Sequence, residues 1–281
     1  MVDHSYRVDG LDVRAARTRF RERCVSPGGM VATALAQAAA LGCPTQLLSA
    51  IGDDPDGRVL RRSLRALGVG TAKLLLRAET PTTVAVVLVA ARGGERRFIV
   101  PDRRALERAA PDFDLGAIRR GALLLVDGHF PRQALRAVRR ARQVGARVVG
   151  DFSRPSPVAR RLLPYVDFPI VPSEFADEYT QGDVERALRR LREEFGGTPV
   201  VTQGARGGVY LGGERVRRYR ARRVAVRDTT GCGDVFHGAF AAGLCRGLEL
   251  EASIALAARA ASVSCTALGA TTRLLKTEDL E

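Results

Sequence analysis

Seven consecutive residues near the carboxyl end of the chain combine two carboxylates with two glycines. They read Asp-Thr-Thr-Gly-Cys-Gly-Asp over residues 228–234, and an apolar segment rich in alanine and glycine follows directly. Glycines at 231 and 233 lack a Cβ, so several backbone N–H groups can point at one anion. A helix that begins here adds a partial positive charge at its N-terminus. This pattern is suited to stabilising the charge that develops on a phosphoryl group during its transfer.

Asp234, the last residue of this motif, is a candidate general base. A carboxylate at the mouth of an anion site can accept the proton of a hydroxyl group that attacks a γ-phosphate in line. A single Asp at a helix start is more often a capping residue. The complete seven-residue string favours the catalytic interpretation of Asp234.

Two common nucleotide-binding signatures are missing from the sequence. No Gly-x-x-x-x-Gly-Lys-Ser/Thr string occurs, and no Gly-x-Gly-x-x-Gly string opens a hairpin. A kinase with this sequence would therefore be neither a P-loop enzyme nor a protein kinase.

From residue 123 onward, short apolar runs alternate with helical segments. This alternation predicts parallel βαβ units and a sheet covered by helices on both faces. The expected strands are 123–127, 147–151, 168–171 and 200–202, and the expected helices are 132–144 and 183–195.

The first third of the chain has a different pattern. Residues 83–90 and 95–100 read as two strands around a Gly93-Gly94 turn, which predicts a β-hairpin. Residues 4–25 lack helical caps and could supply further strands, so we expect a small β lid over one edge of the core. Helices are expected at 30–41 and 54–67, closed by Gly42 and Gly68.

The composition restricts the class of protein. A length of 281 residues allows one large domain or a domain with a lid. No apolar run reaches the ~18 residues of a membrane span, and the N-terminus does not resemble a signal peptide. We therefore expect a cytoplasmic protein with no membrane partner. Five cysteines without a Cys-x-x-Cys pair argue against a disulfide framework and a zinc site.

The formal net charge of +14 comes almost entirely from arginine, because the only lysines are Lys73 and Lys276. The arginines are spread over many segments, and aromatic residues do not alternate with them as a base-stacking surface would require. We therefore expect a solvated arginine-rich surface that attracts anionic nucleotides and sugar phosphates, and no nucleic-acid partner.

The motif at 228–234 resembles the Asp-Thr-x-Gly-Ala-Gly-Asp signature of the PfkB (ribokinase-like) carbohydrate kinases, with Cys232 where Ala is usual. Four further blocks resemble that family in the same order along the chain. They are Gly28-Gly29 with the small-residue segment ending at Leu41-Gly42, the string Ile51–Gly57, the string Val200–Gly208 and the string Ser262–Gly269.

This resemblance implies an α/β fold with a doubly wound, mostly parallel sheet, and an ATP-dependent phosphotransferase that acts on a hydroxyl group of a sugar. One domain would cover 1–281, with lid strands within 4–25 and 72–101 and the core in 26–71 and 102–281. ATP and Mg²⁺ would take part, and it stays open whether a monovalent cation supports the anion site. Exposed edges of the lid strands favour a homodimer formed through the lid.

The resemblance also assigns roles to individual residues. Asp234 would be the base, and the backbone amides of Gly231, Cys232 and Gly233 would form the anion hole. The residues expected to hold the sugar are Asp3, Gly28, Gly29 and Thr33, and those expected to line the nucleotide site are Thr202, Gly204, Gly207, Thr230, Ser262 and Gly269.

The sequence departs from the family pattern in three ways. Almost nothing precedes Asp3, where the family has a core strand, which suggests a truncated or misassigned start. The family's Asn-x-x-Glu motif, which orients Mg²⁺, falls on Ser-Glu-Phe-Ala at 173–176. Asp151, Glu174 and Asp177 then become the candidates to steady the metal. Thr33 stands where a sugar-binding Asn is common.

The Ser-Glu variant and the string Asp-Val-Phe-His-Gly at 234–238 are similar to the sulfofructose and phosphosugar kinase branch. In that branch Arg17, from the lid, would face an anionic group of the substrate. His129 follows an expected strand end, where ligands bind in open α/β sheets, so it is a further candidate for substrate contact.

Two alternatives remain open. A nucleoside kinase would share the motif but stack a base on an aromatic lid, and Phe20 and Phe98 are compatible with that. A ligand-sensing relative without turnover is favoured by the loss of Asn-x-x-Glu and opposed by the intact Asp234 and both motif glycines.

Overall fold

A computed structural model describes residues 1–12, 17–102 and 104–280, and the chain divides into two compact units. Unit 1 contains Met1–Pro111, Arg223–Phe236 and Ala260–Glu281, and unit 2 contains Asp112–Arg222 and His237–Arg259. The two units are described one after the other.

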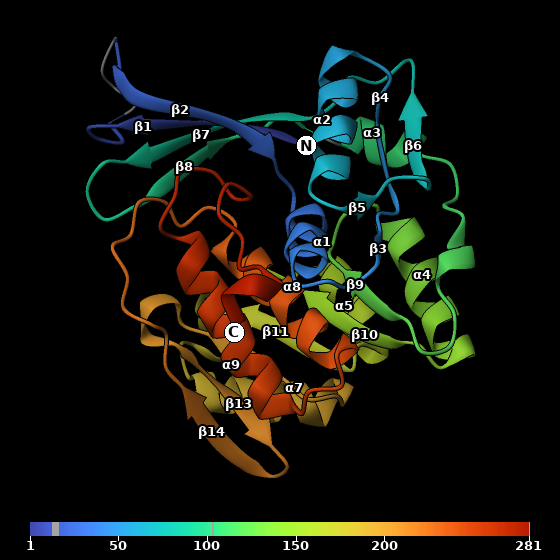
Figure 1. Ribbon diagram of the computed structural model, residues 1–281. Coiled ribbons are helices and arrows are strands. Elements are labelled where there is room, and N and C mark those ends of the chain that lie inside the picture. Colours follow the sequence, from blue (N-terminus) through green and yellow to red (C-terminus); the bar gives the residue numbers. More distant parts are fainter. Residues whose placement is uncertain (13–16, 103, 281) are drawn as a thin grey trace. The chain divides into compact units, whose positions relative to one another are not determined.

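Unit 1 contains a four-stranded sheet, here called the N-terminal sheet, with the strand order β2-β1-β7-β8 (Figure 1). Its strands are β1 (Val2–Val8), β2 (Phe20–Pro27), β7 (Val84–Ala90) and β8 (Arg96–Ile99). β1 is antiparallel to β2 and parallel to β7, and β7 and β8 form an antiparallel hairpin. The predicted hairpin and the predicted strands near the N-terminus are therefore confirmed.

The two faces of the N-terminal sheet differ because side chains alternate along each strand. On one face Val87 and Val89 are fully buried and pack with Leu268. On the other face Phe20, Val25 and Ile99 are 55%, 45% and 58% exposed. The sheet therefore has one face inside the core of unit 1 and one with large apolar side chains at the surface.

The remaining elements of unit 1 are helices and short strand pairs. The helices are α1 (Met30–Ala40), α2 (Pro55–Ala66) and α3 (Arg104–Ala109), and the parallel pairs are β3 (Thr45–Gln46) with β5 (Val69–Gly70) and β4 (Ser49–Gly52) with β6 (Leu74–Arg77). Leu60 and Leu64 of α2 pack with Ile51 in one hydrophobic core. The two predicted helices are confirmed, whereas the four short strands were not predicted.

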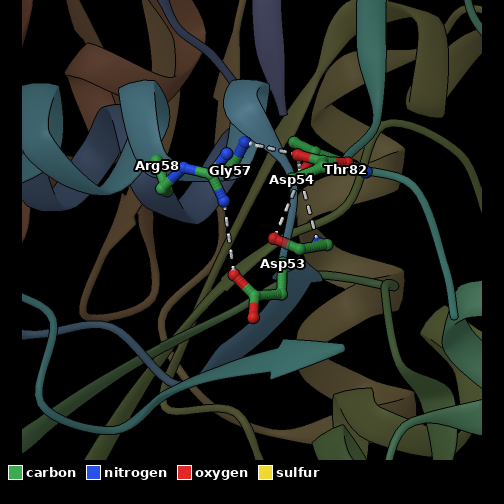
Figure 2. A network of polar contacts seen from close by, with 6 residues as sticks. Asp53, Asp54, Gly57, Arg58 and Thr82 are labelled. Atoms are coloured by element: carbon green, nitrogen blue, oxygen red, sulfur yellow. Dashed lines mark hydrogen bonds and ion pairs between the residues drawn. The ribbon is translucent and has the colours of Figure 1, made fainter. Parts of the chain in front are cut away.

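Asp54 fixes the start of α2 (Figure 2). Its Oδ1 accepts from the backbone N of Gly57 at 2.7 Å, as an N-capping residue does. Its Oδ2 accepts from the backbone N of Thr82 at 2.6 Å, and Oδ1 also accepts from the Thr82 hydroxyl group at 2.8 Å. A Cβ at Gly57 would overlap the carbonyl of Gly52. The string Ile51–Gly57 therefore joins α2 to the residues that precede β7.

Unit 2 is built on a six-stranded sheet with the order β14-β13-β12-β11-β10-β9. The strands are β9 (Leu123–Val126), β10 (Arg147–Asp151), β11 (Phe168–Pro172), β12 (Val200–Thr202), β13 (Gly208–Gly212) and β14 (Arg215–Tyr219). β9 to β12 are parallel, and β13 and β14 are antiparallel additions. The helices that connect them are α4 (Pro131–Val144), α5 (Pro157–Leu162), α6 (Ser173–Thr180) and α7 (Val184–Phe195).

The fold is α/β with a mostly parallel sheet, as predicted. Two further helices, α8 (Cys232–Cys245) and α9 (Leu250–Ser264), follow in the chain, and short 3₁₀ turns lie at 115–117, 163–165, 204–206 and 277–280. Among the helices of the described residues, none is both long and apolar enough to cross a membrane.

A disulfide joins Cys232 to Cys265 within unit 1, with a Cα–Cα distance of 6.3 Å. The composition argued against a disulfide framework, and this single bridge was not predicted. The two cysteines lie 33 residues apart in sequence, and only the fold brings them together.

Candidate functional site

Asp228 anchors the loop of the Asp-Thr-Thr-Gly-Cys-Gly-Asp motif. Its carboxylate is buried and accepts from the backbone N of Thr230 at 2.7 Å and of Gly269 at 2.8 Å. The backbone N–H groups of Arg227 and Asp228 donate to the carbonyl of Cys265 at 2.8 and 3.3 Å. The loop is thus tied to the segment that follows α9, which fixes its conformation before any ligand binds.

The two glycines of the motif differ in backbone conformation and in how closely neighbouring atoms approach them. Gly231 has a φ of 72°, and a Cβ there would lie 2.5 Å from Cβ of Ala270. At Gly233 a Cβ would meet nothing within 4 Å, so the packing of the chain itself does not require glycine there. An exposed glycine next to open space at a helix start leaves room for an anion to approach the backbone.

Helix α8 begins at Cys232, so the positive end of its dipole lies at the motif. The backbone N of Cys232 donates to the carbonyl of Thr229 at 3.3 Å. This long hydrogen bond would have to break or lengthen if the backbone N–H of Cys232 donates to a phosphate instead. Asp234 is half-buried in the first turn of α8, and its role as the base stays a prediction.

Several of the predicted sugar-binding residues gather beside this loop in unit 1. A Cβ at Gly28 would overlap the carboxylate of Asp3, so that carboxylate lies directly against the Gly28 backbone. The Cγ2 atom of Thr33, from α1, would lie 3.3 Å from a Cβ at Gly231. Gly29, with a φ of 99°, is the N-cap of α1.

Three hydroxyl groups in this neighbourhood are buried without a hydrogen-bond partner among the described residues: those of Ser26, Thr33 and Thr230. Ser26 lies opposite Asp3 in the β1–β2 pair. Unpaired buried hydroxyl groups cost free energy, and a polar ligand or water would remove that cost. The set is therefore suited to a ligand with several hydroxyl groups.

The predicted residues of unit 2 follow the carboxyl ends of four adjacent parallel strands. His129 comes after β9, Asp151 ends β10, Glu174 comes after β11 and Thr202 ends β12. Ligands bind at this edge of open α/β sheets. The topology therefore places these four residues along one edge of the sheet, and their roles stay predictions.

Asp151 is the most buried carboxylate of this row. Burial raises the pKa of Asp151 well above its usual range, and the neighbouring charge of Asp127 raises it further, while His129 opposes the shift. Its Oδ2 has no hydrogen-bond partner in the described part of the chain, and Nδ1 of His237 lies 3.4 Å away. His129 is oriented by Asp127, whose Oδ2 is 3.0 Å from its Nδ1.

Asp151 and Glu174 could supply only part of the ligand set of a bound Mg²⁺. Oε2 of Glu174 accepts from the Ser173 hydroxyl group at 3.2 Å. Within the described residues, no three His, Cys, Asp or Glu side chains are grouped as a metal centre. Mg²⁺ commonly binds one or two carboxylates together with phosphate oxygens and water. The buried Oδ2 of Asp151, which accepts no hydrogen bond from the described residues, fits that role.

The residues predicted to bind the nucleotide are divided between the units. In unit 2, Thr202 precedes a tight turn in which Gln203 N donates to Gly207 O at 2.7 Å, and a Cβ at Gly207 would overlap the carbonyl of Tyr219. Thr230 and Ser262 are buried in unit 1. Gly204 has a φ of 55° and Gly269 a φ of 90°.

Arg17 is exposed in the connection between β1 and β2, and its predicted role toward an anionic group stays a prediction. Sequence reasoning gave no role to Asp228, Thr229 or Asp127, although all three make contacts that hold candidate site residues in place. Membership of the motif was the signal for the first two, and the position after a strand was the signal for Asp127.

Comparison with known proteins gives one family match and several relatives. The model of the family described as pfkB family carbohydrate kinase matches residues 1–277. The chain is 27% identical over 263 residues to the ribokinase of Lactococcus lactis, covering 91% of this chain and 85% of that protein. It is also 27% identical over 270 residues to the aminoimidazole riboside kinase of Salmonella typhimurium, covering 88% and 84%.

One solved structure, of a putative ribokinase from Agrobacterium tumefaciens, superposes with a TM-score of 0.90 at 24% identity. The match covers 99% of this chain and 92% of that one.

Proposed function

The chain belongs to the pfkB family of carbohydrate kinases, and we propose that it transfers the γ-phosphoryl group of ATP to a hydroxyl group of a sugar or sugar derivative. The observation that carries this proposal is the anchored motif loop. Asp228 fixes the loop through Thr230 and Gly269, and Thr33 lies beside Gly231. A carboxylate, the two motif glycines and buried hydroxyl groups thus occur in one unit.

In this proposal Asp234 accepts the proton of the attacking hydroxyl group as its oxygen bonds to the γ-phosphorus, while the bond from that phosphorus to the β–γ bridging oxygen breaks and ADP leaves. Asp3, Ser26 and Thr33 orient the sugar by binding its other hydroxyl groups. The N–H groups of Gly231 and Gly233 and the helix dipole stabilise the charge on the transferred group. Such preorganised donors contribute on the order of 10²–10³ in rate each in comparable sites.

Mg²⁺, when bound, would supply positive charge that offsets the charge of the phosphates. On the protein side, Asp151 and Glu174 would hold its water ligands, and the Thr202–Gly207 turn would contact the nucleotide. The buried carboxylate of Asp228 is the kind of group that could attract a monovalent cation to the loop. We further propose that the N-terminal sheet is the lid, which excludes water so that phosphate reaches the sugar rather than solvent.

The aminoimidazole riboside kinase among the relatives favours a second candidate, phosphorylation of a nucleoside-like riboside. The sulfofructose and phosphosugar assignment remains a further candidate for the substrate class. A single panel distinguishes them: coupled ADP release with Mg-ATP across neutral sugars, sugar phosphates, sulfosugars and nucleosides. Turnover with one class identifies the substrate, and ATP binding without turnover on any class contradicts the kinase proposal.

A further inference from the structure

The turn of the β7–β8 hairpin lies directly against the segment that leads into the motif loop, and both belong to unit 1. Gly94, in this turn, is buried and has a φ of 67°. A Cβ at Gly94 would lie 2.8 Å from Cγ1 of Val226 and 3.6 Å from the backbone N of Asp228. Its neighbour Gly93 has a φ of 81° but nothing within 4 Å. Only Gly94 is therefore pressed against the motif segment.

The hydroxyl group of Thr229 connects the hairpin to the loop. It donates to the carbonyl of Gly94 at 2.9 Å and accepts from Nη1 of Arg96 at 2.6 Å. A hydroxyl group has one proton and two lone pairs, so the two bonds form together. The bond from the guanidinium is charge-assisted and therefore stronger than a neutral one.

The backbone of Thr229 is part of the motif loop that we propose binds the transferred phosphate. Its carbonyl accepts from Cys232 N, and it lies between Asp228, which is anchored on both oxygens, and Thr230. Any movement of Thr229 must therefore shift the N–H groups that begin α8. Thr229 therefore contacts the β7–β8 hairpin through its side chain and is part of the motif loop through its main chain.

A second contact also joins the N-terminal sheet to the motif segment, but it contributes less to the stability of that connection. Nη2 of Arg227 lies 2.5 Å from Oε2 of Glu22 on β2, and the two side chains are 44% and 40% exposed. An exposed ion pair is screened by salt and contributes little. The coupling therefore depends mainly on Thr229.

We propose that Thr229, with Arg96 as its partner, is a positioning residue that couples the N-terminal sheet to the anion hole, an inference that rests on the proposed kinase function. When the sheet is in place over the sugar, the two bonds of the Thr229 hydroxyl group hold the loop in its phosphate-binding form. When the β7–β8 turn moves away from Thr229, both bonds break and the loop loses its alignment. Transfer of the phosphoryl group to water is therefore slow unless the bound sugar holds the β7–β8 turn against the motif loop.

The first test compares sugar phosphate formed with ADP released in four variants. Thr229→Val, which keeps the shape and removes the hydroxyl group, and Arg96→Ala should each raise the sugar KM roughly tenfold, the size of one charge-assisted bond. Each should also slow ADP release and sugar phosphate formation to the same extent, because the loop then lacks its alignment even when the sugar is bound. Thr229→Ser should resemble the unmodified protein, and so should Arg97→Ala on the opposite face of β8.

The double variant Arg96→Ala/Thr229→Val should be no worse than Thr229→Val alone, because that single variant already removes both bonds of the hydroxyl group. The proposal would be overturned if the two single increases in sugar KM multiply in the double variant. It would also be overturned if Arg97→Ala raises the sugar KM as much as Arg96→Ala does.

A second test does not depend on turnover. Amide hydrogen exchange should become faster in residues 90–96 in Thr229→Val and stay unchanged in Thr229→Ser. Gly94→Ala should have the same effect as Thr229→Val, whereas Gly93→Ala, with equal backbone strain, should not. Unchanged exchange in Thr229→Val overturns the coupling even if the kinase activity is found. Faster exchange without activity on any substrate would instead count against the proposed function alone.

Discussion

Asp54 and Thr82, 28 residues apart in sequence, are joined by two hydrogen bonds from Thr82 to the Asp54 carboxylate (Figure 2). The carboxylate also caps α2, so one side chain holds the helix start and the segment that enters β7. Burial raises the pKa of Asp54, but the donors on Thr82 and Gly57 outweigh this effect and hold the pKa below its usual value.

Replacing Asp54 by Asn should therefore lower the free energy of unfolding by about 1–3 kcal/mol at pH 7, because the amide has one acceptor oxygen and cannot accept from the backbone N–H groups of both Gly57 and Thr82. Since the pKa is lowered on folding, this stabilisation is present above the ordinary Asp pKa of about 3.9 and disappears as the pH falls through the lower, folded value. Urea unfolding between pH 7 and pH 3 measures it. Asp53→Asn, which removes only an exposed ion pair with Arg58, is the control; an equal loss there would contradict the assignment.

Gly28→Ala should selectively weaken sugar binding. The added methyl group would overlap the carboxylate of Asp3 and push it away from the position proposed for the sugar. We expect the sugar KM to rise at least about tenfold, the cost of one hydrogen bond to a charged group, while the ATP KM changes little. Gly10→Ala, where a Cβ would meet nothing within 4 Å, is the matched control. An unchanged sugar KM in Gly28→Ala would remove Asp3 from the site.

The Cys232–Cys265 bridge should make stability depend on the redox state. Closing a loop of 33 residues stabilises a protein by about 3–4 kcal/mol in the chain-entropy treatment. Cys265→Ser should lose that amount in oxidising buffer and nothing in dithiothreitol, whereas Cys245→Ser, at an exposed free cysteine, should show no redox-dependent difference. Titration of the denatured, unreduced protein should find only the thiols of Cys24, Cys43 and Cys245; five thiols would show that the bridge is not formed.

The exposed face of the N-terminal sheet is the surface through which we propose that two copies associate. Val25 and Ile99 share this face by strand alternation. The register irregularity of the β1–β2 pair at Arg7/Val8 brings Phe20 to the same face, where its ring contacts that of Tyr6. Ile99→Glu should convert a dimer to a monomer in light scattering, because a charge would have to be buried without a partner. Val59→Glu, at an equally apolar but separate exposed site on α2, should leave the mass unchanged. A monomeric unmodified protein would contradict the proposal.

The elements with strong periodicity could be predicted from the sequence, and the contacts between distant segments could not. The parallel strands before Asp151 and Thr202 and the hairpin around Gly93-Gly94 follow from apolar runs and turn residues. The two-residue strands at 45–46 and 69–70 are too short to show a period. The partners of Asp228 and Thr229 lie 41 residues after and 135 residues before them in the chain, so only the fold reveals them.

The resemblance of the motif supplied Asp234, Gly231 and Gly233, whereas the buried hydroxyl group of Ser26 carries no sequence signal. Serine is common in strands and loops, and its importance comes from facing Asp3 across the β1–β2 pair. The disulfide is a similar case, because an odd number of cysteines does not indicate which two are close.

The most direct test of the central claim is phosphoryl transfer by Asp234→Asn, measured as sugar phosphate formed under saturating Mg-ATP and the sugar identified by the panel. The account predicts that kcat falls by roughly 10²–10⁴, the usual contribution of a general base, while the ATP dissociation constant stays close to that of the unmodified protein. A variant that retains kcat within a few-fold, with the fold intact, would contradict the assignment of Asp234 as the base.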